Sequence, residues 1–508
     1  MTATLDLYDI QGDVIKAYGR FGFPLSRYIF LQFIDGKKGR EFVQAISQVV
    51  TTAATWGEGP NAVKRPECTT NIAFTYNGLK ALEVPRESLR GFPTDFMMGM
   101  KARKDILGDD GASDPQHWDP VWEKEVHCLI SFNAQRPNFM DAHYQWLLQQ
   151  IEKSEGGVQL LTGHRGADGK DDLPYQEGNV LFDEKGHPTA MEHFGYTDGI
   201  GDPVFEGLPD MKERVVGRGK QMVVGTADAG WEPLATGEFL LGHFDEAHEY
   251  PTAPAPTTLS RNSTYMVFRK LHENVGTFNR YLDEQSKIFP GSKELLAAKF
   301  VGRWRDNGAP LTDAWDEASK KAWDERFAKA NEQEQDKMLA GVVFDNDISG
   351  SKCPLSAHIR RINPRASLEF GTKDAFDTPG SLANRRRILR RGLPYGHSKK
   401  DQTTDDGNHG IIIMMINASI ERQFEFVQQQ WINYGNDFKA GNDKEILLGN
   451  HDEKDPGRAV FAVDENSDQP PFFLNKIPRL VETRGGEYFF IPSISALNLI
   501  ADGKVDPT

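Results

Sequence analysis

Cysteine is scarce in this chain, and long hydrophobic runs are missing. Only three cysteines occur among 508 residues, at Cys68, Cys128 and Cys353. An odd number of widely spaced cysteines argues against a disulfide framework and against a cysteine-rich zinc site. The densest apolar run, 411–416, is far shorter than the roughly 20 residues that a membrane-spanning helix needs. We therefore expect neither a disulfide scaffold nor a transmembrane protein.

Positive charge is also in deficit. The chain has 59 Lys and Arg against 74 Asp and Glu, a net charge of −15. A surface with this balance repels nucleic acid and anionic membranes, so we expect neither as a partner. The first residues, MTATLDLYDIQGDV, show no basic start and no apolar segment of a signal peptide. A cytoplasmic location and non-classical secretion are both compatible with this, and the location and the oligomeric state stay open.

The hydrophobic pattern repeats one plan four times. An apolar strand-like run is followed by a segment with a single apolar helical stripe, and the four runs are 28–34, 127–132, 264–268 and 411–416. Such units build layered α+β domains, and the long irregular connections argue against a doubly wound parallel sheet. At 508 residues the chain exceeds one compact core. We predict an α+β fold with two related domains, at 1–190 and 191–508.

The arginines are distributed unevenly. Eight of them fall between 360 and 391, at positions 360, 361, 365, 385, 386, 387, 390 and 391. Ion pairing with the acidic remainder of the chain is one interpretation. The other is an anion site, because guanidinium offers a fixed fork of donors to carboxylate or phosphate. The pattern alone leaves both open.

Two further motifs could carry chemistry. His358 stands directly before the arginine cluster, and nearby cations favour the neutral imidazole, which binds metal or acts as a base. Asp198 lies in Gly195-Tyr-Thr-Asp198-Gly199. Glycines on both sides permit a backbone that pushes one carboxylate into a cavity.

Together these pieces resemble the dye-decolorizing peroxidase family of heme enzymes, most closely its longer, fungal-type members. The matching segments, in the family's order, are Asp9–Asp13, Gly195–Gly199, Ala357–Arg365, Arg387–Gly396 and Ile420–Gln428. The resemblance implies two ferredoxin-like domains of the dimeric α+β barrel type, with antiparallel sheets covered by helices and heme b in the C-terminal domain. It also implies an enzyme that uses H2O2 to oxidise phenols, anthraquinone-type dyes and, in some members, Mn2+.

The resemblance also implies roles at the heme. His358 would be the proximal ligand of the heme iron, Asp198 the proton relay on the opposite face, and Arg390 the distal cation. Arg391 is the competing residue, because neighbours on a helix point only about 100° apart. An unperturbed Asp has a pKa near 4, so we expect turnover to be fastest on the acidic side of neutral.

Other residues would support the heme and the substrates. Arg360 and Arg365 are candidates for the heme propionates. A proximal His usually donates its second N–H to an acceptor, for which Glu421 is our choice and Glu425 the alternative.

Bulky substrates need electron transfer at the surface, for which the resemblance implies Tyr395 as the first candidate. Trp431 is the second candidate, although its place on an apolar stripe favours packing in the core. Asp345 and Asp347 supply oxygen ligands suited to Mn2+, although a solvated turn explains them equally well. The acids that could complete such a site are Asp210, Glu334 and Asp336.

Two other functions compete with the peroxidase. A heme-binding or iron-handling protein without fast turnover would need His358 but not the pairing of Asp198 with Arg390. A binding protein for phosphorylated or carboxylated small molecules would use the arginine cluster, yet no Gly-x-x-x-x-Gly-Lys phosphate loop accompanies it.

Overall fold

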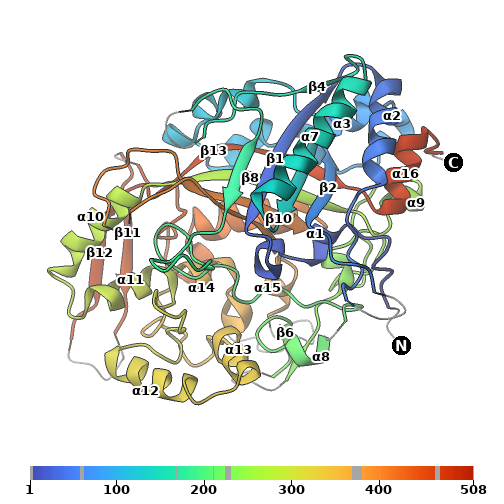
Figure 1. Cartoon of the computed structure of the whole chain (residues 1–508). Helices are drawn as coiled ribbons and strands as arrows, with labels where there is room; N and C mark the ends of the chain where they lie inside the picture. The colour runs from blue at the N-terminus through green and yellow to red at the C-terminus, as the bar shows by residue number, and fades with distance from the viewer. Residues whose placement is uncertain are drawn as a thin grey trace.

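The computed structural model describes residues 4–57, 62–166, 170–209, 211–223, 230–368, 380–399, 401–452, 454–463 and 469–506. All four strand–helix units expected from the sequence are present (Figure 1). They are β1 (Leu25–Phe33) with α2 (Gly36–Ser47), β3 (Cys128–Ala134) with α7 (Pro137–Lys153), β8 (Thr264–Glu273) with α10 (Val275–Ser286), and β10 (Gly410–Asn417) with the π-helical segments η10 (Ile420–Glu425) and η11 (Val427–Ile432).

The strand order repeats in the two halves of the chain. The N-terminal half has the order β4-β1-β3-β2 and the C-terminal half the order β13-β8-β10-β9, all antiparallel. Counted within each half, both read 4-1-3-2. The remaining strands of the sheet are β2 (Cys68–Phe74), β4 (Val158–Leu160), β5 (Gln176–Asn179), β9 (Leu389–Tyr395) and β13 (Val481–Ile491).

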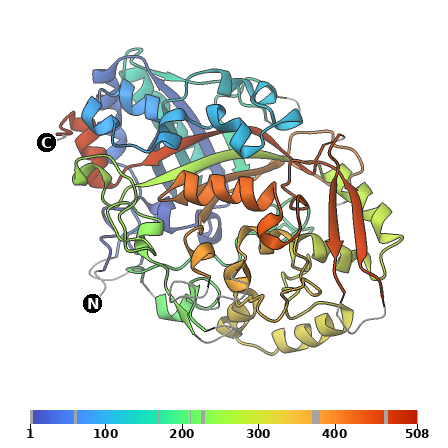
Figure 2. The same cartoon turned by 180° about the vertical axis from the view of Figure 1, so that it is seen from behind.

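The two half-sheets meet at both ends. Phe490 of β13 pairs with Phe74 of β2, and β5, paired with β1, lies against β9. Helices pack outside the sheet, and the 420–432 segment, orange at the centre of Figure 2, runs along its strands. The predicted α+β fold of the dimeric α+β barrel type is thereby confirmed. The boundary at 190/191 stays a prediction.

One hydrophobic core serves both halves. The largest buried cluster runs from Leu5 to Val505 and includes side chains of β1, β3, β8 and β13. The C-terminal helix α16 (Ile494–Asp502) packs against α2. Cys68, Cys128 and Cys353 are buried and free, as expected. Within the described residues, every helix is too short or too polar to cross a bilayer.

Helices added to the C-terminal half enclose the region below the sheet. They are α11 (Lys293–Val301), α12 (Glu317–Phe327), α13 (Glu332–Ala340), α14 (His358–Ile362) and α15 (Ser381–Asn384). The β11–β12 hairpin (Gly457–Phe461, Phe472–Ile477) and the β6–β7 pair (Lys220–Gln221, Trp231–Glu232) lie outside the main sheet. Helix α12 begins with a capping box formed by Asp316 and Ser319, and its Trp323 is fully buried.

Candidate active site

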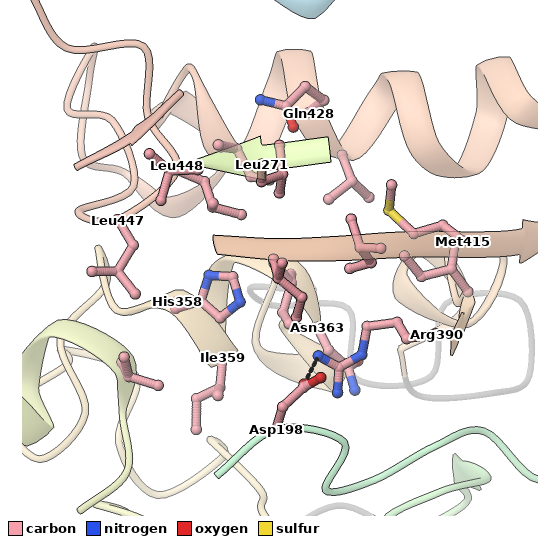
Figure 3. Close-up of a pocket in the computed structure, with 18 of the residues that line it drawn as sticks. Asp198, Leu271, His358, Ile359, Asn363, Arg390, Met415, Gln428, Leu447 and Leu448 are labelled. Carbon is pink, nitrogen blue, oxygen red and sulfur yellow. Dashed lines mark hydrogen bonds and ion pairs between the residues drawn. The ribbon is translucent and has the colours of Figure 1, made fainter. Parts of the chain in front are cut away.

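A cavity of about 300 Å³ lies between the C-terminal half-sheet and the segments below it. Its walls include Leu271 of β8, Met415 of β10, Gln428 of η11 and Asn363 after α14 (Figure 3). His358, Asp198 and Arg390 all line it. Three residues from distant parts of the sequence are therefore brought to one enclosed space.

The loop around Asp198 has the backbone that the motif predicted. Gly195 and Gly199 have φ of +91° and +77°, in the left-handed region that favours glycine. The Gly199 amide donates to Asp198 Oδ1 at 2.6 Å, and Arg390 Nη1 donates to the same oxygen at 2.7 Å. Burial alone would raise the pKa of Asp198, but Arg390, the Gly199 amide and Arg20 together lower it below its usual value. Asp198 therefore stays ionised at a more acidic pH than an unperturbed Asp.

Strand geometry separates Arg390 from Arg391. Both lie on β9, not on a helix as assumed from the sequence, so they point to opposite faces. Arg390 points into the cavity (Figure 3), whereas Arg391 donates to the carbonyls of Asp13 and Val14 and pairs with Asp202 at 3.1 Å. Only Arg390 is placed to act on a molecule beside Asp198.

The carboxylate that lies behind His358 is that of Glu445, not that of Glu421. His358 Nδ1 lies 3.5 Å from Glu445 Oε1, at the outer limit of a hydrogen bond, and Glu445 is fully buried. Burial alone would raise the pKa of Glu445, but the hydrogen bond and charge of His358 and the amides of Leu448 and Leu447 lower it. The anionic side chain is therefore stable behind the imidazole.

The prediction of Glu421 is wrong because its side chain is exposed to solvent. The alternative, Glu425, is buried elsewhere, where it pairs with Arg103 and accepts from Tyr488 Oη. Sequence reasoning considered only the stretch that resembles the family's C-terminal helix. The signal it passed over was a carboxylate directly before an apolar run, Glu445-Ile-Leu-Leu.

Three buried arginines line the cavity without a carboxylate ion pair in the described part of the chain: Arg303, Arg365 and Arg387. Each donates to backbone carbonyls, and Arg365 Nη1 is buried with no hydrogen-bond partner there. Burial lowers the pKa of Arg303 and of Arg387 to about 10. Burial and the charges of Arg387 and Arg303 lower the pKa of Arg365 well below its usual value. Clustered cations of this kind fit an anionic ligand.

Arg360 is not part of this cluster, which corrects the sequence prediction. Its guanidinium donates to Asp347 at 2.9 Å and to the Cys353 carbonyl at 3.0 Å, and it does not line the cavity. Arg365 does line it. Sequence reasoning passed over Arg303, and it placed Arg387 only among the eight arginines of a possible anion site, because lining the cavity depends on which face each arginine presents.

The donor set fits a heme. An imidazole with a buried carboxylate behind it is a common iron ligand. The cavity walls between it and the arginines are largely apolar, and the arginines suit two carboxylates. His358 would hold the iron, with Arg303, Arg365 and Arg387 toward the propionates.

Tyr395 and Trp431 are both buried, with exposed fractions of 1% and 0%. Neither is a surface residue. This argues against Tyr395 as a surface site, whereas for Trp431 the apolar stripe already favoured packing in the core. Tyr395 Oη has no hydrogen-bond partner among the described residues, and the Lys270 ammonium lies 4.7 Å from its ring centroid. Trp431 Nε1 donates to the carboxylate of Asp437 at 3.0 Å.

The acids suggested for Mn2+ do not converge. Asp347 is buried and accepts from Arg360 and from the amides of Lys352 and Cys353, and Asp345 accepts from Gln221 at 2.7 Å. Asp336 pairs with Arg218 at 2.6 Å, and Asp210 lies outside the described residues. In the described ranges no group of three acidic, His or Cys side chains is placed to hold a metal. The Mn2+ site at Asp345 and Asp347 is therefore not supported.

The comparisons with known proteins agree with this fold. Residues 9–167 match the DyP dimeric alpha+beta barrel domain. The structure of an ancestral D-type dye-decolorizing peroxidase superposes with a TM-score of 0.74 at 27% identity, covering 97% of this chain and 99% of that one. A fungal DyP-type peroxidase from Auricularia auricula-judae gives a TM-score of 0.71 at 22% identity, covering 98% and 100%. The fold thus defines a protein of the dimeric α+β barrel class.

The sequence relatives narrow the class to a family. The dye-decolorizing peroxidase of Exidia glandulosa is 30% identical over 535 aligned residues, covering 97% of this chain and 87% of the relative. The dye-decolorizing peroxidase of Mycena epipterygia is 28% identical, covering 98% and 87%. The chain belongs to the dye-decolorizing peroxidase family, and its full-length relatives are enzymes of that kind.

Proposed function

We propose that the cavity binds heme b and that the protein uses H2O2 to oxidise phenols and anthraquinone-type dyes. The observation that carries this proposal is the meeting of His358, backed by Glu445, with the Asp198–Arg390 pair in one cavity (Figure 3). A heme carrier would need only His358 and Glu445. The presence of the Asp198–Arg390 pair therefore favours the enzyme.

Heme, when bound, supplies an iron that binds peroxide and accepts its oxidising equivalents. Asp198 takes the proton from one peroxide oxygen on its carboxylate and returns it to the other oxygen, which leaves as water. Arg390 donates hydrogen bonds to the negative charge that develops on the peroxide oxygens. His358 is held in orientation by Glu445.

The substrate class is proposed from the family and from access to the cavity. A solved dye-decolorizing peroxidase in complex with 2,6-dimethoxyphenol shares this fold, with a TM-score of 0.72 at 22% identity. A small phenol is therefore a suitable first substrate. Mn2+ is left out of the proposal, because the Asp347 carboxylate is already bound by Arg360.

We propose that oxidation of bulky dyes proceeds through Trp431 rather than Tyr395. An oxidised tyrosine must lose its phenolic proton, for which buried Tyr395 has no hydrogen-bond acceptor among the described residues, and Lys270 disfavours positive charge on its ring. Trp431 follows cavity-lining Gln428 on η11, and Asp437 accepts its N–H. Tyr434, three residues further on, is 43% exposed, so we propose it as the contact with the dye.

The test is the absorption spectrum of the protein reconstituted with hemin, before and after one equivalent of H2O2 at mildly acidic pH. The expected result is a ferric Soret band that changes within milliseconds and returns on addition of 2,6-dimethoxyphenol. His358→Ala should lose the band, while Arg390→Leu should keep it and react slowly. A band that peroxide only bleaches slowly would contradict the enzyme and favour the carrier.

A further inference from the structure

Two glutamates on the cavity wall are left without a role by the reaction described above. Glu192 precedes Asp198 by six residues on the same loop, and Glu273 ends β8. Both line the cavity, and Glu273 accepts from the amide of His193, the residue next to Glu192. Each carboxyl group also influences the pKa of the other. Neither forms an ion pair with a Lys or Arg in the part of the chain that the structure describes.

Backbone amides hold both carboxyl groups in place. Glu192 accepts from the amides of Phe194 and Tyr196 at 2.8 and 2.7 Å, and Glu273 accepts from the amide of His193 at 3.1 Å. The same contacts fold the segment that presents Asp198. The pair is therefore part of the wall that carries the proton-accepting carboxylate.

Two carboxyl groups this close cannot both be ionised, so they hold at least one proton between them. Burial, together with the charge of Asp198, raises the pKa of Glu192 to about 7. Burial and the charges of Glu192 and Asp198 raise the pKa of Glu273 well above its usual value. The Glu192–Glu273 pair, which holds a proton, therefore lies on the same cavity wall as Asp198, a carboxylate whose pKa is lowered.

The other charged groups around Glu192 and Glu273 do not remove the shared proton. Arg305, whose pKa Glu192 helps to raise, is held by Glu294 and by the Phe194 carbonyl. On the cavity wall, Arg269 is paired with Asp109 and Arg390 with Asp198. Burial lowers the pKa of His193 to about 4 and lowers that of His409, so the nearby imidazoles are neutral at working pH.

We propose that Glu192 and Glu273 form a shared-proton pair that supplies protons to Asp198 during turnover. Reduction of one H2O2 to two waters consumes two electrons and two protons. Bulky dyes oxidised outside the cavity supply the electrons and release their own protons there, so with these substrates both protons must reach the cavity through the protein. The pair gives a proton to Asp198, Asp198 passes it to the departing water, and the pair is reprotonated from solvent. This inference rests on the proposed function.

The first test detects the proton shared by Glu192 and Glu273 without turnover. Infrared difference spectra of the hemin-reconstituted protein, titrated from pH 5 to 8, should show a protonated-carboxyl C=O band that persists to about pH 7. Glu273→Gln and Glu192→Gln should each lower the intensity of that band, to which other acids with raised pKa values, such as Asp13, also contribute. Glu487→Gln is the matched control: Glu487 is a half-buried acid whose pKa is also raised by burial, but it does not line the cavity. A titration unchanged in Glu273→Gln would overturn the proposal.

The second test separates proton supply from peroxide binding. In Glu273→Gln the rate of reaction with H2O2 should stay near that of the wild type, while kcat with saturating dye falls at least about tenfold and its solvent isotope effect rises. Glu273→Asp should recover part of kcat, and Glu487→Gln should leave the pH profile unchanged. Equal kcat in wild type and Glu273→Gln at every pH would refute the pair's role. A wild type that does not react with H2O2 would refute the proposed function instead, and the infrared result would still stand.

Discussion

The ionisation of Asp198 is set by its contact with Arg390. Arg390 Nη1 lies 2.7 Å from the carboxylate, and a smaller contribution comes from Arg20, which donates to the Asp198 carbonyl at 3.4 Å. The ionised carboxylate accepts the peroxide proton, and a lowered pKa keeps it ionised as the pH falls. In the wild type, the rate of reaction with H2O2 should therefore decline only below the usual Asp pKa of about 3.9.

Removing the cation should move that decline to higher pH. In Arg390→Leu the midpoint should rise by about one unit or more, because an adjacent opposite charge lowers a carboxyl pKa by roughly that amount. Arg20→Leu should give a smaller rise. Stopped-flow rates from pH 3 to 6 measure both. An unchanged midpoint in Arg390→Leu would show that other groups hold the charge of Asp198.

Trp431 and Tyr395 can be distinguished by matched substitutions. Trp431→Phe should lower kcat for an anthraquinone dye about tenfold or more, because a Phe ring neither oxidises easily nor has an N–H for Asp437. The same variant should leave 2,6-dimethoxyphenol oxidation within about twofold. Tyr395→Phe should alter neither rate. Loss of dye oxidation in Tyr395→Phe alone would restore the original candidate.

At the scale of single elements, the 442–451 segment positions the proximal side of the cavity. Glu445 lies on it, and His451 Nε2 lies 2.9 Å from the Glu445 carbonyl. Glu445→Gln should keep the packing but weaken heme retention about tenfold, because the imidazole loses its anionic neighbour. Glu421→Gln, the matched change at the exposed residue, should have no effect. Hemin transfer to apomyoglobin measures heme retention in both variants. Weaker retention in Glu421→Gln than in Glu445→Gln would restore Glu421 as the residue behind His358.

Helix α14 is anchored by two buried arginines from the cluster noted in the sequence. Arg361 donates to the carbonyls of Leu355, Trp431, Tyr434 and Asp443. Arg360 pairs with Asp347, with side-chain exposures of 1% and 3%. Arg360→Leu should therefore destabilise the protein by about 3 kcal/mol, because it leaves the buried Asp347 carboxylate without its cation.

Thermal unfolding of the apoprotein measures this loss. The double variant Arg360→Leu/Asp347→Leu should recover part of it, since no unpaired charge then remains buried. If the double variant is less stable than the single one, the ion pair is not the main contribution of Arg360. A Tm of Arg360→Leu equal to that of the wild type would have the same meaning.

At the scale of the whole molecule, the two repeated halves share one core. The main buried cluster includes side chains from both halves, and α16, near the end of the chain, packs on α2 near its start. The apoprotein should therefore unfold in a single calorimetric transition. A fragment of residues 1–190, which lacks β13 and α16, should not unfold cooperatively. A cooperative transition of that fragment would show that the predicted domain is independently stable.

The strand–helix units could be recognised in the sequence because local patterns carry them, whereas the roles of His358, Asp198 and Arg390 came from the resemblance to the family's motifs. A period of two or 3.6 residues marks a buried strand or helix face, and the glycines around Asp198 mark its turn. The competition between Arg390 and Arg391 was settled only by β9, since adjacent strand residues face opposite ways. Patterning along the chain could not show that the segment was a strand.

The partners of those residues were decided by the tertiary structure alone. Glu445 lies 87 positions from His358, and no local pattern links an imidazole to a carboxylate at that separation. The same holds for Arg303 and Arg387 at the cavity, for Arg360 on Asp347, and for the burial of Tyr395. The sequence by itself determined which elements form and which residues can do chemistry. Which of them meet was decided by the packing of two half-sheets around one core, because contacts between distant segments depend on how whole elements pack.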